Sequence, residues 1–437
     1  MRIDPPRRRA AALARAAHFR AAGEVQENAG SPMQTRYGQS PWIAGYPSGK
    51  RPSFPRLRGE HQADVVIVGA GLTGCATAMA CAVAGLKPLI LEAERVGQAS
   101  TGRSSGLLLP DPGPSFRDVA RRHGLRVAKS VFSTWRRAAL DAAAQLRRLS
   151  ISCNLDPRES LLVGHQDDEK GLVREYDARE AAGVSVSWLT RRQITAVTPL
   201  DAPAAMRVRD SFILDPYRAC IGLAGAASKR GATFFEQTRA RKVRTARKHV
   251  EIVVDGGVIK AGTVIVATGT ATQEFRPLQR HFKPREVYHV LTEPMPTGVR
   301  KQVGNRGVTV KDTAGSGRRV VWTSDGRMLV VGGDQDETPA RSRSDVLVQR
   351  TGQLMYEALT MYPAISGLQP EFGWDASYGE TADGLPYIGA HRNFPRHLFA
   401  LGGAGDSLTR SFLAARMLVR ALQGDVDKGD QVFGWTR

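Results

Sequence analysis

The sequence predicts an α/β fold, in which a Rossmann-like nucleotide-binding domain is joined to a second domain built mainly from strands. Three observations support this prediction. A β-branched strand, a glycine-rich turn and a helix follow one another over residues 64–84, a second β-branched strand ends at Ala267, and strand patterns dominate residues 276–372. A chain of 437 residues with 42% hydrophobic content is also long enough for two or three domains.

The first of these segments has the spacing of a dinucleotide-binding turn. Val65–Val68 is a short apolar run typical of a buried parallel strand. A G-x-G-x-x-G pattern follows it, formed by Gly69, Ala70, Gly71, Leu72, Thr73 and Gly74. The first glycine permits a tight turn, the second lets backbone N–H groups approach a pyrophosphate, and the third lets the helix pack closely on the sheet. The helix N-terminus then offers free N–H donors to the phosphates.

An acidic residue stands where such a site needs one. Glu92 directly follows the next predicted strand, Leu89–Leu91, where a carboxylate can accept a hydrogen bond from a ribose hydroxyl. A carboxylate there disfavours a 2′-phosphate, and therefore NADP, but it does not separate FAD from NAD. The glycine pattern alone is weak evidence, and its combination with the flanking strand, the helix and Glu92 favours a dinucleotide site over a plain glycine turn.

The loop after Glu92 is rich in hydrogen-bond donors. Residues 96–106 include Ser100, Thr101, Gly102 and Arg103, whose hydroxyl, N–H and guanidinium groups can bind phosphates or a flavin ring. A flexible surface loop is the alternative interpretation.

The other elements follow from local patterns in chain order. Helices are predicted over 117–150 with an interruption at Gly124, from about 169 to 182, from Pro216 to about Gly231, from about 345 to 362 and over 408–422. Strands are predicted over 161–163, 233–235, 242–245, 250–254, 263–267, 287–292, 320–322, 328–331 and 398–401.

The first 60 residues are predicted to be a tail and an arm. Residues 1–32 are basic and are expected to be poorly ordered. They are interpreted either as a transit peptide or as an over-extended start, since Met33 would also begin a sensible protein. Residues 34–60 carry several prolines and are predicted to form an extended arm on the surface.

The net charge of +20 and the cysteine spacing limit the possible partners. A basic surface, including a cluster over 239–248, can attract nucleic acid, anionic lipid or an acidic substrate, but no nucleic-acid motif accompanies it, so nucleic-acid binding is not favoured. The four cysteines have no metal-ligand spacing, which predicts no metal site, no disulfides and a reducing, cytoplasmic location. No apolar run reaches membrane-spanning length, so no membrane span is predicted.

Taken together, these segments resemble the D-amino acid oxidase-like superfamily of FAD-dependent oxidoreductases. The resemblance is strongest to its γ-glutamylputrescine oxidase-like and sarcosine/glycine oxidase-like branches. The resemblance runs from about Ser40 to Gly424. Its motifs are the glycine turn with Glu92, the loop over 97–106, and the segments 215–217, 267–269, 291–294, 332–333 and 379–389. The order of these motifs is specific, whereas each one alone is weak.

The resemblance implies a discontinuous, Rossmann-like FAD-binding domain with an inserted substrate domain of mixed or antiparallel sheet, and the flavin ring at their interface. It divides the chain into the tail and arm (1–60), the FAD-binding domain (61–150, 200–275 and 373–437) and the substrate domain (151–199 and 276–372). It also implies oxidation of a C–N bond of an amine or amino acid by hydride transfer to flavin N5, with O2 or another electron acceptor.

Site residues are implied by the same resemblance. Beyond the glycine turn and Glu92, it places at FAD Ala93, Ser100, Thr101, Gly102, Arg103, Val243, Ala267, Thr268, Gly269, Gly384, Gly403, Ala404, Gly405, Asp406 and Ser407. The catalytic candidates are Arg103, His289 and Tyr378, with Tyr288, Trp322 and Arg410 as further candidates for substrate contact. An arginine among them can pair bidentately with a substrate carboxylate. For each, packing or a phosphate contact is the alternative.

Three departures from the family pattern affect the chemistry. Asp406 and Ser407 follow Gly405 where the family has small or apolar residues, and an acid beside the flavin would disfavour its reduced anion. The region 375–378 lacks the cysteine to which some members attach flavin, which predicts non-covalent FAD. Val330 stands nearest to the position of the family's oxygen-activating lysine, so oxidase and dehydrogenase both remain open.

Two other functions are compatible with the same sequence. C–O oxidation of a 2-hydroxy acid or a polyol phosphate would use the same fold and cofactor. A non-catalytic or RNA-associated flavoprotein is supported only by the basic charge.

Overall fold

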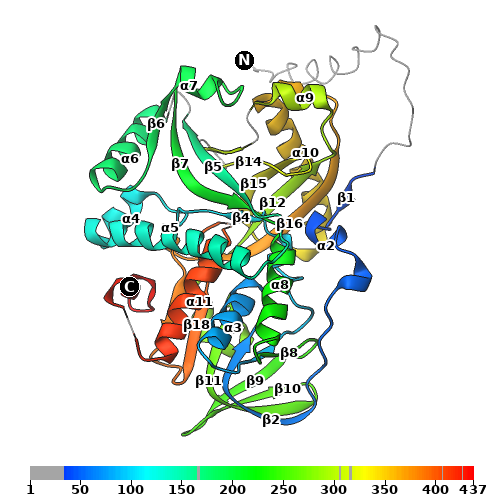
Figure 1. The fold of residues 1–437 in the computed structure, drawn as a ribbon, viewed down its shortest axis with the longest axis vertical. Helices are drawn as coiled ribbons and strands as arrows, with labels where there is room; N and C mark the ends of the chain where they lie inside the picture. Colours follow the sequence, from blue (N-terminus) through cyan, green and yellow to red (C-terminus); the bar gives the residue numbers. More distant parts are fainter. Residues whose placement is uncertain (1–33, 165–167, 305–306, 314–316, 406, 426) are drawn as a thin grey trace, which may run out of the picture. The chain divides into compact units, whose positions relative to one another are not determined.

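The computed structural model describes residues 34–437, except residues 165–167, 305–306, 314–316, 406 and 426. The predictions for residues 1–32, for Met33 and for Asp406 therefore lie outside the described residues. Residues 35–437 form one compact unit with two sheets (Figure 1). These two sheets confirm the predicted fold class, an α/β fold with a second part built mainly from strands.

The eight-stranded sheet contains the predicted nucleotide-binding strands. Its order is β17-β18-β11-β2-β3-β8, and β10 and β9 continue from β11 as an antiparallel hairpin. The strands from β18 to β8 are parallel, so their carboxyl ends lie along one edge. The bounds are β2 (Gly59–Val68), β3 (Leu89–Leu91), β8 (Thr233–Phe235), β9 (Ala240–Thr245), β10 (Val250–Val254), β11 (Gly257–Gly269), β17 (Tyr387–Ala390) and β18 (His397–Leu401).

Side chains along β2 alternate between two cores, as expected for a strand covered on both faces. Val65 and Ile67 face a core shared with α3 (Leu72–Val83), α8 (Pro216–Ser228) and α11 (Thr409–Leu422), which lie side by side in Figure 1. Val66 faces the opposite core, which the β9–β10 hairpin covers. The small residues of α3 are buried in this packing, which brings the helix close to the strands.

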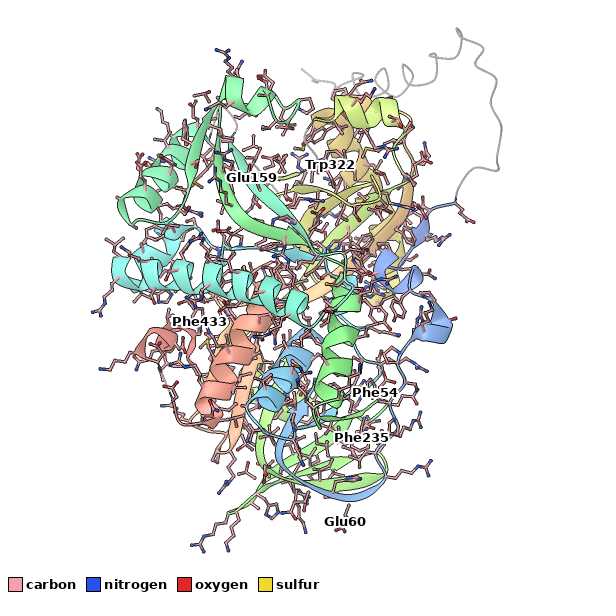
Figure 2. All side chains as sticks on the ribbon, viewed as in Figure 1. Phe54, Glu60, Glu159, Phe235, Trp322 and Phe433 are labelled. Atoms are coloured by element: carbon pink, nitrogen blue, oxygen red, sulfur yellow. The ribbon has the colours of Figure 1, made fainter. Side chains whose placement is uncertain are left out.

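The predicted helix over 117–150 is two helices, α4 (Phe116–His123) and α5 (Leu125–Arg148), and Gly124 between them has a φ of +88°. The predicted interruption is therefore confirmed. Near the carboxyl end of the chain, Phe433 packs against Trp135 of α5 with ring centroids 6.4 Å apart (Figure 2). The neighbouring elements are α6 (Glu169–Ala181), β6 (Ser187–Thr190) and α7 (Arg191–Thr195).

The ten-stranded sheet has the order β1-β16-β12-β15-β14-β13-β5-β7-β4, with β6 paired to β7. One face, here called the outer face, packs on α10 (Arg343–Met361), and the other, the inner face, carries its own apolar cluster. The bounds are β1 (Arg36–Tyr37), β4 (Leu107–Leu108), β5 (Asp156–Gly164), β7 (Ala204–Ile213), β12 (Lys283–Thr292), β13 (Val308–Asp312), β14 (Arg319–Trp322), β15 (Met328–Asp336) and β16 (Pro370–Glu380), with the short helix α9 (Thr297–Gln302).

Some local expectations need correction. Residues 34–60 are not simply an extended arm, because β1 pairs with β16 and Pro41–Ala44 forms the short helix α2, capped by the Ser40 side chain. β7 and most of β16 belong to the ten-stranded sheet, although the predicted boundaries assign residues 200–275 and 373–437 to the FAD-binding domain. The two-domain division itself stays a prediction.

Candidate functional site

The glycine turn has the geometry that the sequence predicts. Gly69 has a φ of +101°, and a Cβ on it would lie 2.7 Å from the Ala267 carbonyl oxygen. A Cβ on Gly74 would lie 1.8 Å from the Gly69 carbonyl oxygen, so only glycine permits this contact between α3 and the turn. The turn is therefore closed by backbone contacts on both sides.

Glu92 holds the same turn from the next strand. Its Oε2 accepts a hydrogen bond of 2.8 Å from the Ala70 N–H, and its Oε1 accepts one of 2.9 Å from the Glu94 N–H. Burial raises the pKa of this carboxyl, while the two amide donors oppose that rise. Each carboxylate oxygen can accept a further bond, so Glu92 can hold the turn and still accept from a ribose hydroxyl.

Hydroxyl groups surround the N-terminus of α3. The Leu72 N–H donates to Thr101 Oγ1 at 2.9 Å, which joins the donor-rich loop to the first turn of the helix. Thr73 Oγ1 lies 2.9 Å from Ser411 Oγ, which joins α3 to α11. The loop over 97–106 is therefore part of the site and is not a free surface loop.

A cavity of about 540 Å³ opens from this turn. It follows the carboxyl ends of β2, β3, β11 and β18 and continues beneath β12 and β16. This is where ligands bind in open parallel sheets. The sequence-predicted residues that line it are Gly69, Gly71, Leu72, Thr73, Glu92, Ala93, Ser100, Thr101, Val243, Ala267, Thr268, Gly269, Gly405 and Ser407.

Other predicted cofactor residues stand behind the wall of this cavity. Ala70, Gly74, Gly102, Arg103, Gly384, Gly403 and Ala404 are not among its lining residues. The Ala404 N–H donates to the Gly384 carbonyl oxygen at 2.8 Å, and Gly403 has a φ of +133°, so these residues shape the turn that presents Gly405. Asp406 is outside the described residues.

Some lining residues were missed by the sequence reasoning. Arg239, which the sequence places in a basic surface cluster, lines the cavity, and so do Thr272, Glu274, Gln279, Ser377 and Ser411. The position of Arg239 just before β9 was the available signal. The others become neighbours of the glycine turn only through tertiary packing.

Two candidates for substrate contact do face the cavity. Tyr378 lines it, and its hydroxyl donates to Asp334 Oδ2 at 2.8 Å. Burial, followed by the nearby Asp334, raises the pKa of Tyr378, so the side chain stays a neutral phenol at physiological pH. Arg410 also lines the cavity, and its Nη1 donates to the Gly405 carbonyl oxygen at 3.4 Å.

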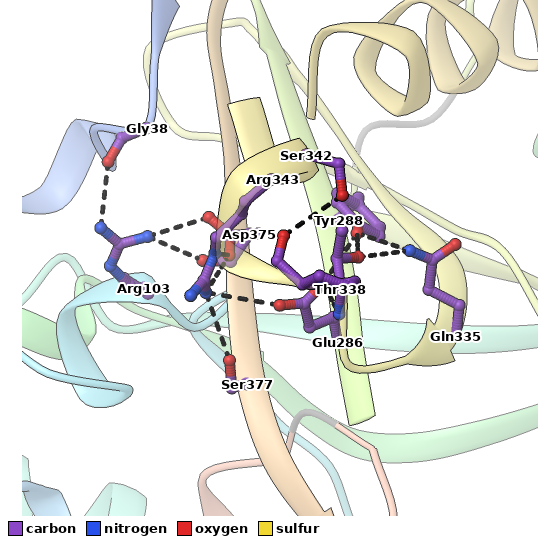
Figure 3. A network of polar contacts seen from close by, with 11 residues as sticks. Gly38, Arg103, Glu286, Tyr288, Gln335, Thr338, Ser342, Arg343, Asp375 and Ser377 are labelled. Carbon is purple, nitrogen blue, oxygen red and sulfur yellow. Dashed lines mark hydrogen bonds and ion pairs between the residues drawn. The ribbon is translucent and has the colours of Figure 1, made fainter. Parts of the chain in front are cut away.

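Arg103 belongs instead to a polar network that anchors β16 (Figure 3). Its Nη1 donates to Asp375 Oδ1 at 3.0 Å and its Nη2 donates to the Gly38 carbonyl oxygen at 3.1 Å. Arg343 Nε donates to Asp375 Oδ2 at 2.8 Å, so the buried carboxylate is held from both sides. These contacts support a role for Arg103 in holding the loop against β16, and its contact with substrate stays a prediction.

Three other candidates do not reach the cavity. His289 is fully buried and stacks on Trp374, with ring centroids 4.9 Å apart and planes 9° apart. Tyr288 and Trp322 are buried on the outer face of the ten-stranded sheet. Along a strand, adjacent side chains alternate between faces, and this alternation removes Tyr288 and Trp322 from the inner face. None of these three residues lines the cavity, and their contact with substrate stays a prediction.

The parallel sheet, the glycine turn and the cavity define a dinucleotide-binding protein of Rossmann type. The family model for FAD dependent oxidoreductases, named DAO, matches residues 64–421, and the chain belongs to this family. It is an FAD-dependent oxidoreductase enzyme, and the cavity fits FAD because its turn has the close backbone contacts and helix N-terminus that a pyrophosphate requires.

Individual proteins of known identity are similar to this chain. Gamma-glutamylputrescine oxidoreductase of Escherichia coli is 22% identical over 381 residues, which cover 86% of this chain and 87% of that protein. The crystal structure of glycine oxidase from Geobacillus kaustophilus superposes with a TM-score of 0.71 at 20% identity, covering 86% of this chain and 99% of that one. An FAD-bound L-alpha-glycerophosphate oxidase structure from Mycoplasma pneumoniae has a TM-score of 0.66 at 17% identity, covering 83% and 95%.

Two features are absent from the described part of the chain. None of its helices is both long enough and apolar enough to cross a bilayer. No group of three or more His, Cys, Asp or Glu side chains is placed there to hold a metal ion.

Proposed function

We propose that this enzyme oxidises a C–N bond of an amine or amino acid, using FAD bound non-covalently in the 540 Å³ cavity. One observation carries the proposal: a single cavity runs from the glycine turn to the inner face of β12 and β16. It therefore joins a nucleotide-binding end to an end that a second sheet covers.

The proposed division of the cavity follows from the chemistry of its walls. The turn over 69–74 and Glu92 take the nucleotide half, because they provide backbone donors and a carboxylate acceptor. Val287 and Ala376 cover the other half with apolar surface, which excludes water from the reacting atoms. FAD bound there would supply the electron sink for oxidation of the C–N bond.

The protein need only bind and orient a neutral amine for this chemistry. Tyr378 is proposed to present its phenol edge to the substrate, with its rotation fixed by the bond to Asp334. Arg410 is proposed to provide a cationic donor at the opposite wall. These two residues line the cavity, whereas His289 and Arg103 do not.

The cysteines support the non-covalent mode and a reducing environment. All four are buried and free, and none lines the cavity. We therefore also propose that the protein acts in the cytoplasm, which fractionation of native cells would test. A protein found in an oxidising compartment would contradict that location.

The experiment is anaerobic reduction of the bound flavin, which needs no assumption about the electron acceptor. The nitrogen compounds are glycine, L-alanine and γ-glutamylputrescine. The hydroxyl compounds are glycolate, L-lactate and glycerol 3-phosphate. Loss of the visible flavin band with nitrogen compounds alone supports C–N oxidation. Bleaching by the hydroxyl compounds alone would overturn it in favour of C–O oxidation, the second candidate, which the glycerophosphate oxidase fold favours.

A further inference from the structure

A second cavity lies under the same inner face of the ten-stranded sheet. Its volume is about 460 Å³, and its walls include Thr309 and Lys311 of β13, Arg319 of β14 and Ser160 of β5. It is close to the first cavity: Gly113 lines the second, a Cβ on Gly113 would lie 3.2 Å from Ala404 Cβ, and the adjoining Gly405 lines the first.

Strand register relates the strands of the two cavities across the sheet. Residues Trp374, His289, Val331, Arg319, Lys311 and Leu162 are successive cross-strand partners from β16 to β5. Val287, which lines the first cavity, is on β12, and Lys311 is three strands away. Neighbouring strands are about 4.8 Å apart, so β12 and β13 lie about 14 Å apart across the sheet.

Two like charges stand opposite each other among these cross-strand partners. Lys311 and Arg319 are direct partners in the antiparallel pair of β13 and β14, and both line the second cavity. Like charges directly opposite each other destabilise a sheet. Within the described residues, neither side chain has an ion pair or hydrogen bond. The Thr309 hydroxyl, on the same strand and only 2% exposed, also has no partner there.

Five acids also line this cavity: Asp111, Asp118, Asp168, Glu175 and Asp312. Asp118 pairs with Arg121, and Asp312 pairs with Arg318. Arg179 Nη1 donates to Asp111 Oδ2 at 2.8 Å, and its Nε donates to Glu175 Oε1 at 2.8 Å. Asp334 accepts from Tyr378. The cavity therefore offers two cationic donors and one hydroxyl to an incoming anion, and Arg179 neutralises part of the negative charge on the opposite wall.

We propose that Lys311 and Arg319, with Thr309, bind a carboxylate of the substrate that lies several atoms beyond the oxidised C–N bond. The inference rests on the proposed function and narrows its substrate class to amines with a distal carboxylate. A short amine without that group would occupy the first cavity only and leave the two cations unneutralised.

The ionisation of Lys311 gives the site a pH signature. Burial lowers the pKa of Lys311 to about 8. The charges of Arg319 and Arg179 add to this decrease, whereas those of Asp111 and Asp334 oppose it. Anion binding is therefore expected to be retained below about pH 8 and to weaken above it as the ammonium loses its proton. An arginine at position 311 would remain charged and would not show this loss.

The experiment uses the FAD-loaded enzyme and two probes. Adipate, a dicarboxylate without an amine, is titrated by calorimetry. Anaerobic flavin reduction is compared for ε-aminocaproate and hexylamine, which differ in the terminal carboxylate. The variants are Lys311→Met, Arg319→Met and Lys311→Arg, and the matched control is Lys260→Met, which removes an exposed strand lysine on β11 of the other sheet.

We expect Lys311→Met and Arg319→Met each to weaken adipate binding about 10- to 100-fold, while Lys311→Arg and Lys260→Met stay near wild type. Wild type should prefer ε-aminocaproate over hexylamine, and Lys311→Met should lose that preference. Equal adipate affinity in all variants, or no preference in wild type, would overturn the inference. If adipate binding depends on Lys311 but no amine reduces the flavin, the anion site stands and the proposed function fails.

Discussion

The two sheets line the same cavity, but one contributes mainly backbone groups and the other contributes mainly side chains. The eight-stranded sheet presents backbone: the turn over 69–74 is closed by glycine contacts, and Glu92 binds two amides of its own chain. The ten-stranded sheet presents side chains: Tyr378 is oriented by Asp334, and the Asp375 carboxylate is held between Arg103 and Arg343.

This difference suits the eight-stranded sheet to binding the cofactor and the ten-stranded sheet to recognising the substrate. A backbone cradle recognises a pyrophosphate that is common to all FAD enzymes, so it tolerates little change. Side chains on a sheet face can be exchanged without altering the strands, so the covering sheet is where specificity can vary. Single substitutions in each sheet test this difference, because changes in the first should affect FAD binding and changes in the second should affect stability or substrate recognition.

The largest effect is expected at Gly74. In Gly74→Val, the new Cβ would meet the Gly69 carbonyl oxygen, so we expect loss of flavin absorbance from the purified protein and destabilisation of about 4 kcal/mol or more. Gly225→Ala on α8 is the control, because its Cβ meets no atom within 4 Å, and it should gain about 0.4–1 kcal/mol. A Gly74→Val protein that keeps its flavin would contradict the backbone account.

The next effect is expected in the Asp375 network. Arg103→Met removes one of the two arginines from a buried carboxylate and should cost about 3–4 kcal/mol in urea unfolding, with flavin binding retained at saturating FAD. The control is Arg241→Met, whose partner Asp255 is as exposed as itself, and this change should be too small to measure. Equal costs for the two variants would mean that the network does not anchor β16.

Stability is expected to depend on pH through Asp215, the N-cap residue of α8, which follows β7 of the ten-stranded sheet. Burial raises the pKa of Asp215 from its ordinary value of 3.8 to about 6, against the pull of Arg218 and its backbone amide. Because the folded pKa is the higher one, this group's contribution to stability is complete below about pH 4 and is lost as pH rises to about 6, by at most about 3 kcal/mol.

Asp215→Asn keeps an N-cap side chain but removes that titration. Relative to wild type, the variant should therefore become more stable from about pH 4 to about pH 7 when unfolding is followed at each pH. A constant difference across this range would show that Asp215 does not titrate there.

The smallest structural effect is expected at Tyr378. Tyr378→Phe removes one hydrogen bond to Asp334 and should change stability by about 1 kcal/mol, because the ring stays in place. The proposed role in substrate contact predicts a clear rise in KM or fall in the rate of flavin reduction, with unchanged FAD affinity. A variant with wild-type kinetics would remove Tyr378 from the site.

The eight-stranded sheet could be predicted because its information is local. Val65–Val68, the glycine spacing and Glu92 lie close together in sequence, and the predicted strands over 233–235, 250–254 and 263–267 fall within β8, β10 and β11. The family resemblance, now confirmed by the matching family model, located Val243 and Gly405 beside the cavity.

The ten-stranded sheet was less predictable because its site depends on long-range register. His289 and Tyr288 are adjacent in sequence but face opposite sides of β12, and neither lines the first cavity. Lys311 and Arg319 become partners only through the pairing of β13 with β14. No local pattern marked β7, which pairs with β5 across a bulge.

One cavity, between the carboxyl ends of the parallel strands and the inner face of the other sheet, is expected to hold FAD. The most direct test is titration of the flavin-free protein with FAD, followed by its absorption spectrum, alongside Gly74→Val and Gly225→Ala. We expect one FAD bound per chain with a shifted flavin spectrum, released by acid precipitation, in wild type and Gly225→Ala only. A wild-type protein that takes up no FAD, or a Gly74→Val variant that takes it up equally well, would contradict it.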